Sequence, residues 1–322
     1  MTKIERIIIT SFPVAFILNK SKHWYLPGFE GVPLYDVGRF FLGQVKTVGL
    51  TERASAIAYN FIMAIPPSFL FLFTLIPHLP FIKKKDILNQ VRLILKDLIP
   101  VETFNSKVAV FIDETFFDKP VFGLLSFGLL LAWFFASNAM MGIMRSFNKN
   151  YIGFAKRKGL HDRWVAIRLT TLLFGLVLGC LILLITQGAF LKGLKSPFWK
   201  DFILYTRWIF IIALVFYSIS FIYKYAPAVH KKWKLVSPGS ILATFMCILA
   251  TLGFSEFVNN FGKYNALYGS IGTIIVLMAL IFINSLVLLI GFELNVSIKS
   301  LRAIAEKRDA HEKELAAREK TT

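Results

Sequence analysis

The sequence predicts an all-α integral membrane protein: a six-transmembrane-helix bundle with amphipathic helices at the N-terminus and in an external loop. Composition gives the first observation, since hydrophobic residues make up 56% of the chain and charged residues only 17%. Soluble domains carry about 25% charged residues. The second observation is that the apolar residues form six runs, each close to the roughly 20 residues that a helix needs to cross a bilayer. A soluble helical core of this composition would leave too little polar surface.

Each run should be a helix, because no backbone polar group can face lipid without a partner. The fifth run has Ser237 as a helix N-cap and Pro238 at the first helical position. Cys180 and Cys247 fall inside runs, so we expect them to pack rather than to form a disulfide. The transmembrane domain covers residues 54–298, and its predicted spans are residues 54–77, 121–144, 165–188, 202–223, 238–260 and 270–298.

The distribution of basic residues predicts the orientation of the chain. With six spans, both termini lie on one side of the membrane, and that side carries 25 of the 37 Lys and Arg residues. The contrast is sharpest between residues 145–168, with seven bases and one acid, and residues 79–119, with seven bases and six acids. The positive-inside rule therefore places both termini in the cytoplasm. Contact of the basic loops with anionic lipid head groups explains the net charge of +18 better than nucleic-acid binding does.

Three segments lie outside the spans. Residues 1–53 should form cytoplasmic interfacial helices, because residues 33–48 place apolar side chains at helical spacing. That helix could lie on the inner membrane surface or pack beneath the bundle. Residues 79–119 should form two short amphipathic helices at the outer surface. Residues 299–322 alternate basic and acidic residues, which is typical of a solvated helix.

Two adjacent prolines, Pro66 and Pro67, fall near the middle of the first span. They remove two backbone donors and clash with the preceding turn, so the helix must kink or break there. Asn60 and Ser68 are close enough to bond the freed carbonyls. An interrupted helix at mid-membrane often lines a transporter cavity, whereas a simple proline kink needs no function.

Charged and amide side chains inside the spans should face one another. We expect Arg207 and Glu256, at similar depth near the outer ends of two spans, to form an ion pair, although both could instead extend to the outer interface. Glu293, near the inner end of the last span, should meet Arg53 or another inner basic residue.

One face of the last span carries small and amide residues. Asn284, Gly291 and Asn295 fall on it, and we expect this face to point into the bundle, since such residues mediate helix contacts in membranes.

Several ordered motifs carry a family resemblance. Residues 260–272 read NFGKYNALYGSIG and residues 288–295 read LLIGFELN, supported by RASAIAY, FNKNY and YKYAP at three earlier positions. The chain resembles the YihY/BrkB family of bacterial inner-membrane proteins, formerly labelled ribonuclease BN. The resemblance implies a six-helix fold in the inner membrane and suggests a role in envelope integrity or lipid export. The motifs also hold the remaining candidates for cavity or structural polar residues: Tyr59, Asn260, Tyr268 and Gly269.

Enzyme motifs are missing from the sequence. The five histidines lie far apart, and no HExxH, CxxC, phosphate-binding loop or GxSxG occurs. We therefore expect no catalytic residues, metal or cofactor. The leading hypothesis is transport or lipid translocation, with membrane lipids as partners. The alternative is a scaffold that binds envelope proteins without transporting anything, and a ribonuclease is the weakest reading, because a metal-dependent nuclease needs clustered carboxylates or histidines.

Overall fold

The computed structural model describes residue 16 and residues 19–75, 122–148, 159–193, 197–229, 232–260 and 263–319. The expected external helices of residues 79–119 lie outside these residues. The described helices are α3 (Leu34–Thr47), α4 (Leu50–Leu75), α7 (Phe122–Phe147), α8 (Gly159–Gly193), α9 (Pro197–Tyr225), α10 (Pro238–Asn260) and α11 (Lys263–Glu319).

Five of these helices, α7 to α11, are long and apolar enough within the described residues to cross a membrane. Helix α10 has the predicted bounds. Helix α4 forms where the first span was predicted but is not among the five, so the count of six spans is not confirmed. The chain is therefore an all-helical protein with at least five membrane-spanning candidates.

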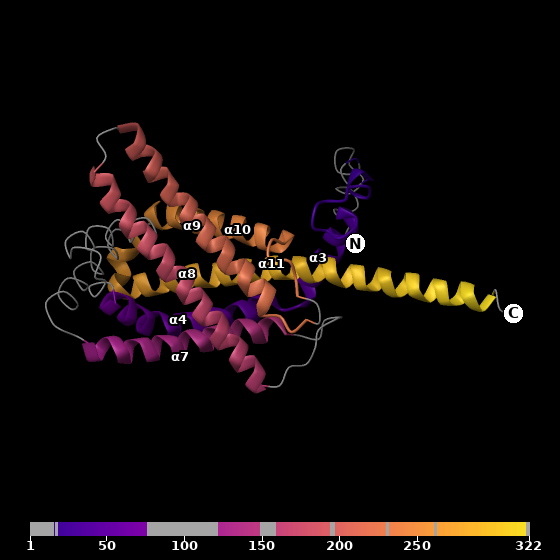
Figure 1. Cartoon of the computed structure of the whole chain (residues 1–322), viewed down its shortest axis with the longest axis horizontal. Coiled ribbons are helices and arrows are strands. Elements are labelled where there is room, and N and C mark those ends of the chain that lie inside the picture. The colour runs from indigo at the N-terminus through magenta and orange to yellow at the C-terminus, as the bar shows by residue number, and fades with distance from the viewer. Residues whose placement is uncertain are drawn as a thin grey trace.

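The last helix is longer than predicted. Helix α11 has 57 residues, about 86 Å at the α-helical rise, and joins the predicted sixth span to the charged tail without interruption. After Gly291 the helix contains no glycine or proline that would stop it. Ion pairs between Arg302 and Glu306, and between Arg308 and Glu312, add i,i+4 support in the part that projects beyond the bundle (Figure 1).

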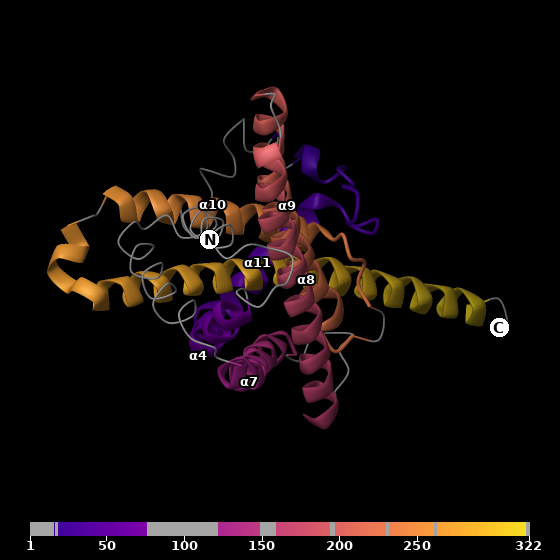
Figure 2. The ribbon, with the colours of Figure 1, turned by 60° about the vertical axis from the view of Figure 1, so that its left-hand side comes forward.

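Helices α4 and α7 form one pair and α10 and α11 form another, and the two pairs point in different directions in Figure 2. Helices α8 and α9 cross α11 steeply (Figures 1 and 2). Helix α4 packs mainly on α7, and α10 packs mainly on α11, which also contacts α3 and α4.

Packing is dense at one end of this bundle, which we call the packed end. The main core cluster there takes residues from six helices, because the chain alternates in direction and returns to this end each time. Its members are Leu50, Ala54, Ile57, Met140, Ile143, Met144, Phe147, Ala166, Leu169, Ile219, Ile222, Tyr223, Ala226, Trp233, Ala243, Leu288, Leu289, Phe292 and Val296. Large apolar side chains are exposed on the outside of the helices. Near the packed end they include Tyr59, Trp164, Ile241 and Phe245, and in the opposite halves they include Phe127, Leu130, Tyr205, Ile209, Leu252, Phe257, Ile274 and Met278.

Helix α3 packs against the outside of the packed end. Val37 is fully buried in a small cluster with Phe29, Val32 and Ile298, the last from α11. Of the two arrangements expected for this segment, contact with the bundle is therefore present.

Helices α10 and α11 approach so closely that two glycines are required at their crossing. A Cβ atom at Gly291 would lie 2.6 Å from the carbonyl oxygen of Gly239 and 2.7 Å from the Cβ of Ala243. A Cβ at Gly239 would likewise overlap the Gly291 carbonyl oxygen and the Asn295 side chain. Small residues of this kind let membrane helices pack backbone to backbone.

We expect Gly239→Ala to destabilise the protein by about 1–3 kcal/mol, because the added methyl group overpacks the crossing. The matched control is Gly253→Ala in the same helix, where a Cβ meets nothing within 4 Å. Thermal unfolding of both variants in detergent, followed by gel filtration, should show a lower melting temperature for Gly239→Ala only. Equal melting temperatures would contradict the close approach.

Candidate functional site

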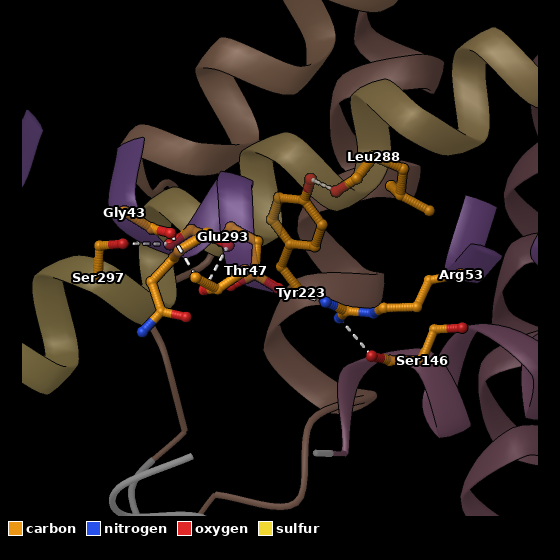
Figure 3. Close-up of polar contacts among 9 residues, drawn as sticks. Gly43, Thr47, Arg53, Ser146, Tyr223, Leu288, Glu293 and Ser297 are labelled. Atoms are coloured by element: carbon orange, nitrogen blue, oxygen red, sulfur yellow. Dashed lines mark hydrogen bonds and ion pairs between the residues drawn. The ribbon is translucent and has the colours of Figure 1, made fainter. Parts of the chain in front are cut away.

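A buried ion pair joins three helices at the packed end. Arg53 of α4 donates from Nη1 to Oε1 of Glu293 on α11, at 2.6 Å, and the two side chains are only 6% and 0% exposed. The same guanidinium donates from Nη2 to the carbonyl oxygen of Ser146 near the end of α7. Figure 3 shows this group extending from Arg53 toward Ser146. The predicted contact between Glu293 and Arg53 is present.

Because both side chains are buried, each charge needs the other as a counter-charge. Removing two charges from water costs several kcal/mol per ion, and only close, well-hydrogen-bonded partners compensate for it. One turn further along α11, the Ser297 hydroxyl donates to the backbone carbonyl oxygen of Glu293 at 2.7 Å. Since either charge alone would be uncompensated, α4, α7 and α11 are held in one relative position.

An aromatic cluster lies next to the ion pair. The ring of Phe292, the residue before Glu293, stacks on Phe147 with centroids 3.8 Å apart. Trp233 and Tyr223 pack on the same Phe292 ring at 5.4 and 6.2 Å. These rings surround the carboxylate's helix with apolar surface, which excludes water from this part of the packed end.

Two hydrogen bonds fix the surrounding backbone. The Tyr223 hydroxyl donates to the Leu288 carbonyl oxygen at 2.6 Å, which ties α9 to α11 (Figure 3). The Asn148 Oδ1 accepts from the backbone N–H of Ala228 at 2.8 Å, which ties the end of α7 to the loop after α9.

Asn295 caps helix α10 from a different helix. Its Oδ1 accepts from the N–H of Gly239 at 2.9 Å, and its Nδ2 donates to the Ser237 hydroxyl at 2.9 Å. The Ser237 hydroxyl accepts from the N–H of Ser240, and its carbonyl oxygen accepts from Ile241, so the predicted N-cap is confirmed. Because Pro238 has no N–H, these bonds satisfy the first turn of α10 completely, and it has no free donors for an anion.

The predicted inward face of α11 is confirmed. Asn284 donates to the Thr251 hydroxyl of α10 at 3.4 Å, Gly291 meets Gly239, and Asn295 caps α10. The three residues therefore line the contact between α10 and α11 along its length.

Four of the predicted site residues, Tyr59, Asn60, Pro66 and Pro67, lie on helix α4. Asn60 donates to the Ala56 carbonyl oxygen at 2.7 Å and lies against Gly142 of α7. The sequence predicted either a kink or a break at Pro66 and Pro67. The helix is continuous through both prolines, so the predicted break is wrong. Two prolines remove only two bonds of the ladder, and the flanking turns continue the helix. Tyr59 is exposed and does not join the buried cluster.

The remaining candidates stay predictions. Arg207 is half-buried on α9 and Glu256 is exposed on α10, but their ion pair is not established. The side chains of Asn260 and Tyr268 and the surroundings of Gly269 lie outside the described part of the structure.

The comparisons with known proteins decide the family. The family described as "Virulence factor BrkB" matches residues 41–317. The chain belongs to the BrkB family. A relative from Bacillus subtilis, YfkH, whose name describes it as ribonuclease-like, is 29% identical over 81% of this chain and 94% of its own length. A UPF0761 membrane protein of Haemophilus influenzae, NTHI0384, is 24% identical over 82% of this chain and 95% of its own length.

A third relative covers a shorter region. The UPF0761 membrane protein PSHAa0171 of Pseudoalteromonas translucida is 30% identical over 28% of this chain and 31% of its own length. No solved structure matches the chain.

In this BrkB-family chain, sequence reasoning missed several residues of the buried cluster. Tyr223, Phe147 and Phe292 were not singled out, although each lies in one of the quoted motifs. Trp233 was missed too, since it lies in a loop whose basic residues dominate its pattern. The motifs were the signal, but helix periodicity alone does not show that residues from three separate motifs meet.

A cleft of about 40 Å³ opens beside the Asn295 cap. That volume holds a few water molecules rather than a lipid or drug-sized ligand. Neither Asn60 nor Asn284 reaches it. Its lining residues are Gly28, Glu30, Trp233, Lys234, Val236, Ser237, Pro238, Asn295, Ile298 and Lys299.

We expect Glu293→Gln to destabilise this BrkB-family protein by about 3–5 kcal/mol, because Arg53 would remain buried without its counter-charge. Glu312→Gln, at an exposed i,i+4 pair of the same helix, is the matched control and should change little. The measurement is the yield and melting temperature of monodisperse protein in detergent. Replacing both partners, as Arg53→Met with Glu293→Leu, should recover part of the loss. A stable Glu293→Gln single variant would show that the charge is not needed.

Proposed function

We propose that this chain translocates a lipid, or another amphiphile with a charged head group, across the bacterial inner membrane. The supporting observation is the difference between the two ends of the bundle. The buried cluster at the packed end takes side chains from six helices. The described cluster of Cys180 and Leu184 in the opposite halves involves α8 and α9, and large apolar side chains of those halves are exposed.

Such surfaces suit acyl chains. Membrane helices do not associate through the hydrophobic effect, because lipid tails are as apolar as leucine, so uncovered apolar faces are stable in contact with lipid. A helix pair that is tightly fixed at one end and loosely packed at the other can admit a lipid chain between its loose halves. In this proposal the ion pair of Arg53 and Glu293 closes the bundle on the side of the packed end.

Electrostatics favour an anionic head group. The loop between α9 and α10 carries Lys232 and Lys234 at the packed end, and the net charge of the chain is +18. Each basic residue near an anionic membrane surface contributes about 1 kcal/mol of attraction. The sequence has no nucleotide-binding loop, so the proposal assigns the driving force to a gradient, a partner protein or equilibration between leaflets.

The second candidate, a scaffold for envelope proteins, is favoured by two observations. Buried side chains fill the packed end, and the cleft described beside it measures about 40 Å³. Helix α11 also projects beyond the bundle with an exposed, charged surface that could bind a partner (Figure 1).

A lipid-flipping assay separates the two candidates. The protein is reconstituted into vesicles of phosphatidylethanolamine and phosphatidylglycerol that contain a trace of fluorescent phosphatidylglycerol. Dithionite then bleaches the outer leaflet. Translocation predicts that the protected inner-leaflet fluorescence falls below that of protein-free vesicles, in proportion to the protein added.

Vesicles with an unrelated helical membrane protein control for leakage caused by insertion alone. A protected fraction equal to that of this control, for both fluorescent phosphatidylglycerol and fluorescent phosphatidylethanolamine and also with a proton gradient imposed across the vesicles, would contradict translocation by the protein alone and favour the scaffold.

A further inference from the structure

We propose that the N-terminal hook, which we define as residues 19–33, is a docking surface for anionic phospholipid head groups at the membrane surface where α10 begins. This inference is independent of lipid translocation, since a scaffold could carry the same surface.

Three consecutive large side chains on the hook are uncovered. Trp24, Tyr25 and Leu26 are 50%, 62% and 41% exposed. Trp and Tyr are enriched at membrane–water interfaces, because each has an apolar ring that enters the acyl boundary and a polar group that stays at the head-group level. A solvated loop would gain nothing from three such residues in succession.

The hook holds these side chains on a fixed base. The N–H of Leu34, the first residue of α3, donates to the Trp24 carbonyl oxygen at 2.9 Å. The N–H of Phe29 donates to the Leu26 carbonyl oxygen at 3.1 Å. Phe29 and Val32 are buried against α11. The turn itself takes positive φ angles at Gly28 and Glu30, of 89° and 54°.

An ion-pair clamp completes the base. Glu30 pairs with Lys299 and, at 3.2 Å, with Arg302 on α11. Burial opposes ionisation of the Glu30 carboxyl, but hydrogen bonds and charge from Lys299 and Arg302 outweigh burial, so its pKa is lowered. The carboxylate is therefore ionised at neutral pH, and the clamp weakens only when the pH falls through this lowered pKa.

The depth of the hook is fixed by one contact. A Cβ at Gly28 would lie 2.9 Å from Cγ of Pro238, so the backbone of the hook touches the first residue of α10. Helix α10 is a membrane-span candidate over Pro238–Val258. The hook therefore lies at the level where a span enters the bilayer, and Figure 1 shows this indigo segment extending sideways from α11 beside that end of α10.

The charge on the hook matches an anionic surface. The Lys20 Nζ lies 5.5 Å from the centroid of the Trp24 ring, and the Lys22 Nζ lies 5.4 Å from that of Tyr35. Both lysines are exposed. Since α11 neutralises Glu30, the exposed charge of the hook is basic. Ammonium groups beside interfacial aromatic rings are placed to bind phosphate oxygens of lipid head groups.

The test uses the full-length chain with both native cysteines replaced by serine. Tyr25→Cys is labelled with an environment-sensitive fluorophore and compared with Asp309→Cys in the projecting, exposed part of α11. Each protein is placed in nanodiscs of phosphatidylcholine with increasing phosphatidylglycerol, and gel filtration checks that each variant is folded.

The proposal predicts that the label at position 25 has blue-shifted emission, is quenched by lipid-attached quenchers, and responds more strongly as phosphatidylglycerol rises. Lys20→Gln with Lys22→Gln should remove the dependence on phosphatidylglycerol. The label at position 309 should stay in water throughout. Emission at position 25 equal to that at 309, or quenching that does not depend on phosphatidylglycerol, would overturn the proposal.

Discussion

A buried guanidinium needs a counter-charge, and the packed end of this molecule is built around that requirement. Arg53 and Glu293 are 240 residues apart in the chain, and the same guanidinium also donates to a carbonyl oxygen near the end of α7. The stacked ring of Phe292 immediately before Glu293 makes the surroundings apolar. In that environment the pair tolerates little displacement, so α4, α7 and α11 must meet at this level.

The other close contacts depend on the position that the ion pair sets. With α11 fixed, Gly291 and Asn295 lie one turn apart on the face that receives α10, where one permits backbone approach and the other caps the helix. Tyr223 adds α9 through the Leu288 carbonyl oxygen. In the opposite halves, the described buried cluster is smaller and involves α8 and α9, and large apolar side chains are exposed. This contrast is the basis on which we propose a lipid-handling role for this BrkB-family chain.

The sequence was sufficient for features that depend on local pattern or on the cost of burying charge. The positions of the helices followed from apolar runs, the start of α10 from Ser237 and Pro238, and the pairing of Glu293 with Arg53 from the cost of isolated charges in apolar surroundings. Features that depend on the sum of many weak interactions could not be predicted from the sequence. Local pattern does not decide whether α4 continues through Pro66 and Pro67, whether α11 extends into the tail, or whether Phe147, Tyr223 and Phe292 meet.

Chemical modification of Glu293 tests the central claim most directly. A hydrophobic carbodiimide enters membranes and reacts with protonated carboxyl groups, and mass spectrometry locates the adduct. We expect Glu293 to stay unmodified in the native protein, because its side chain is fully buried against Arg53, and to react in an Arg53→Met variant shown to be folded. Modification of Glu293 in the native protein at the rate seen in the Arg53→Met variant would contradict a buried ion pair at the packed end.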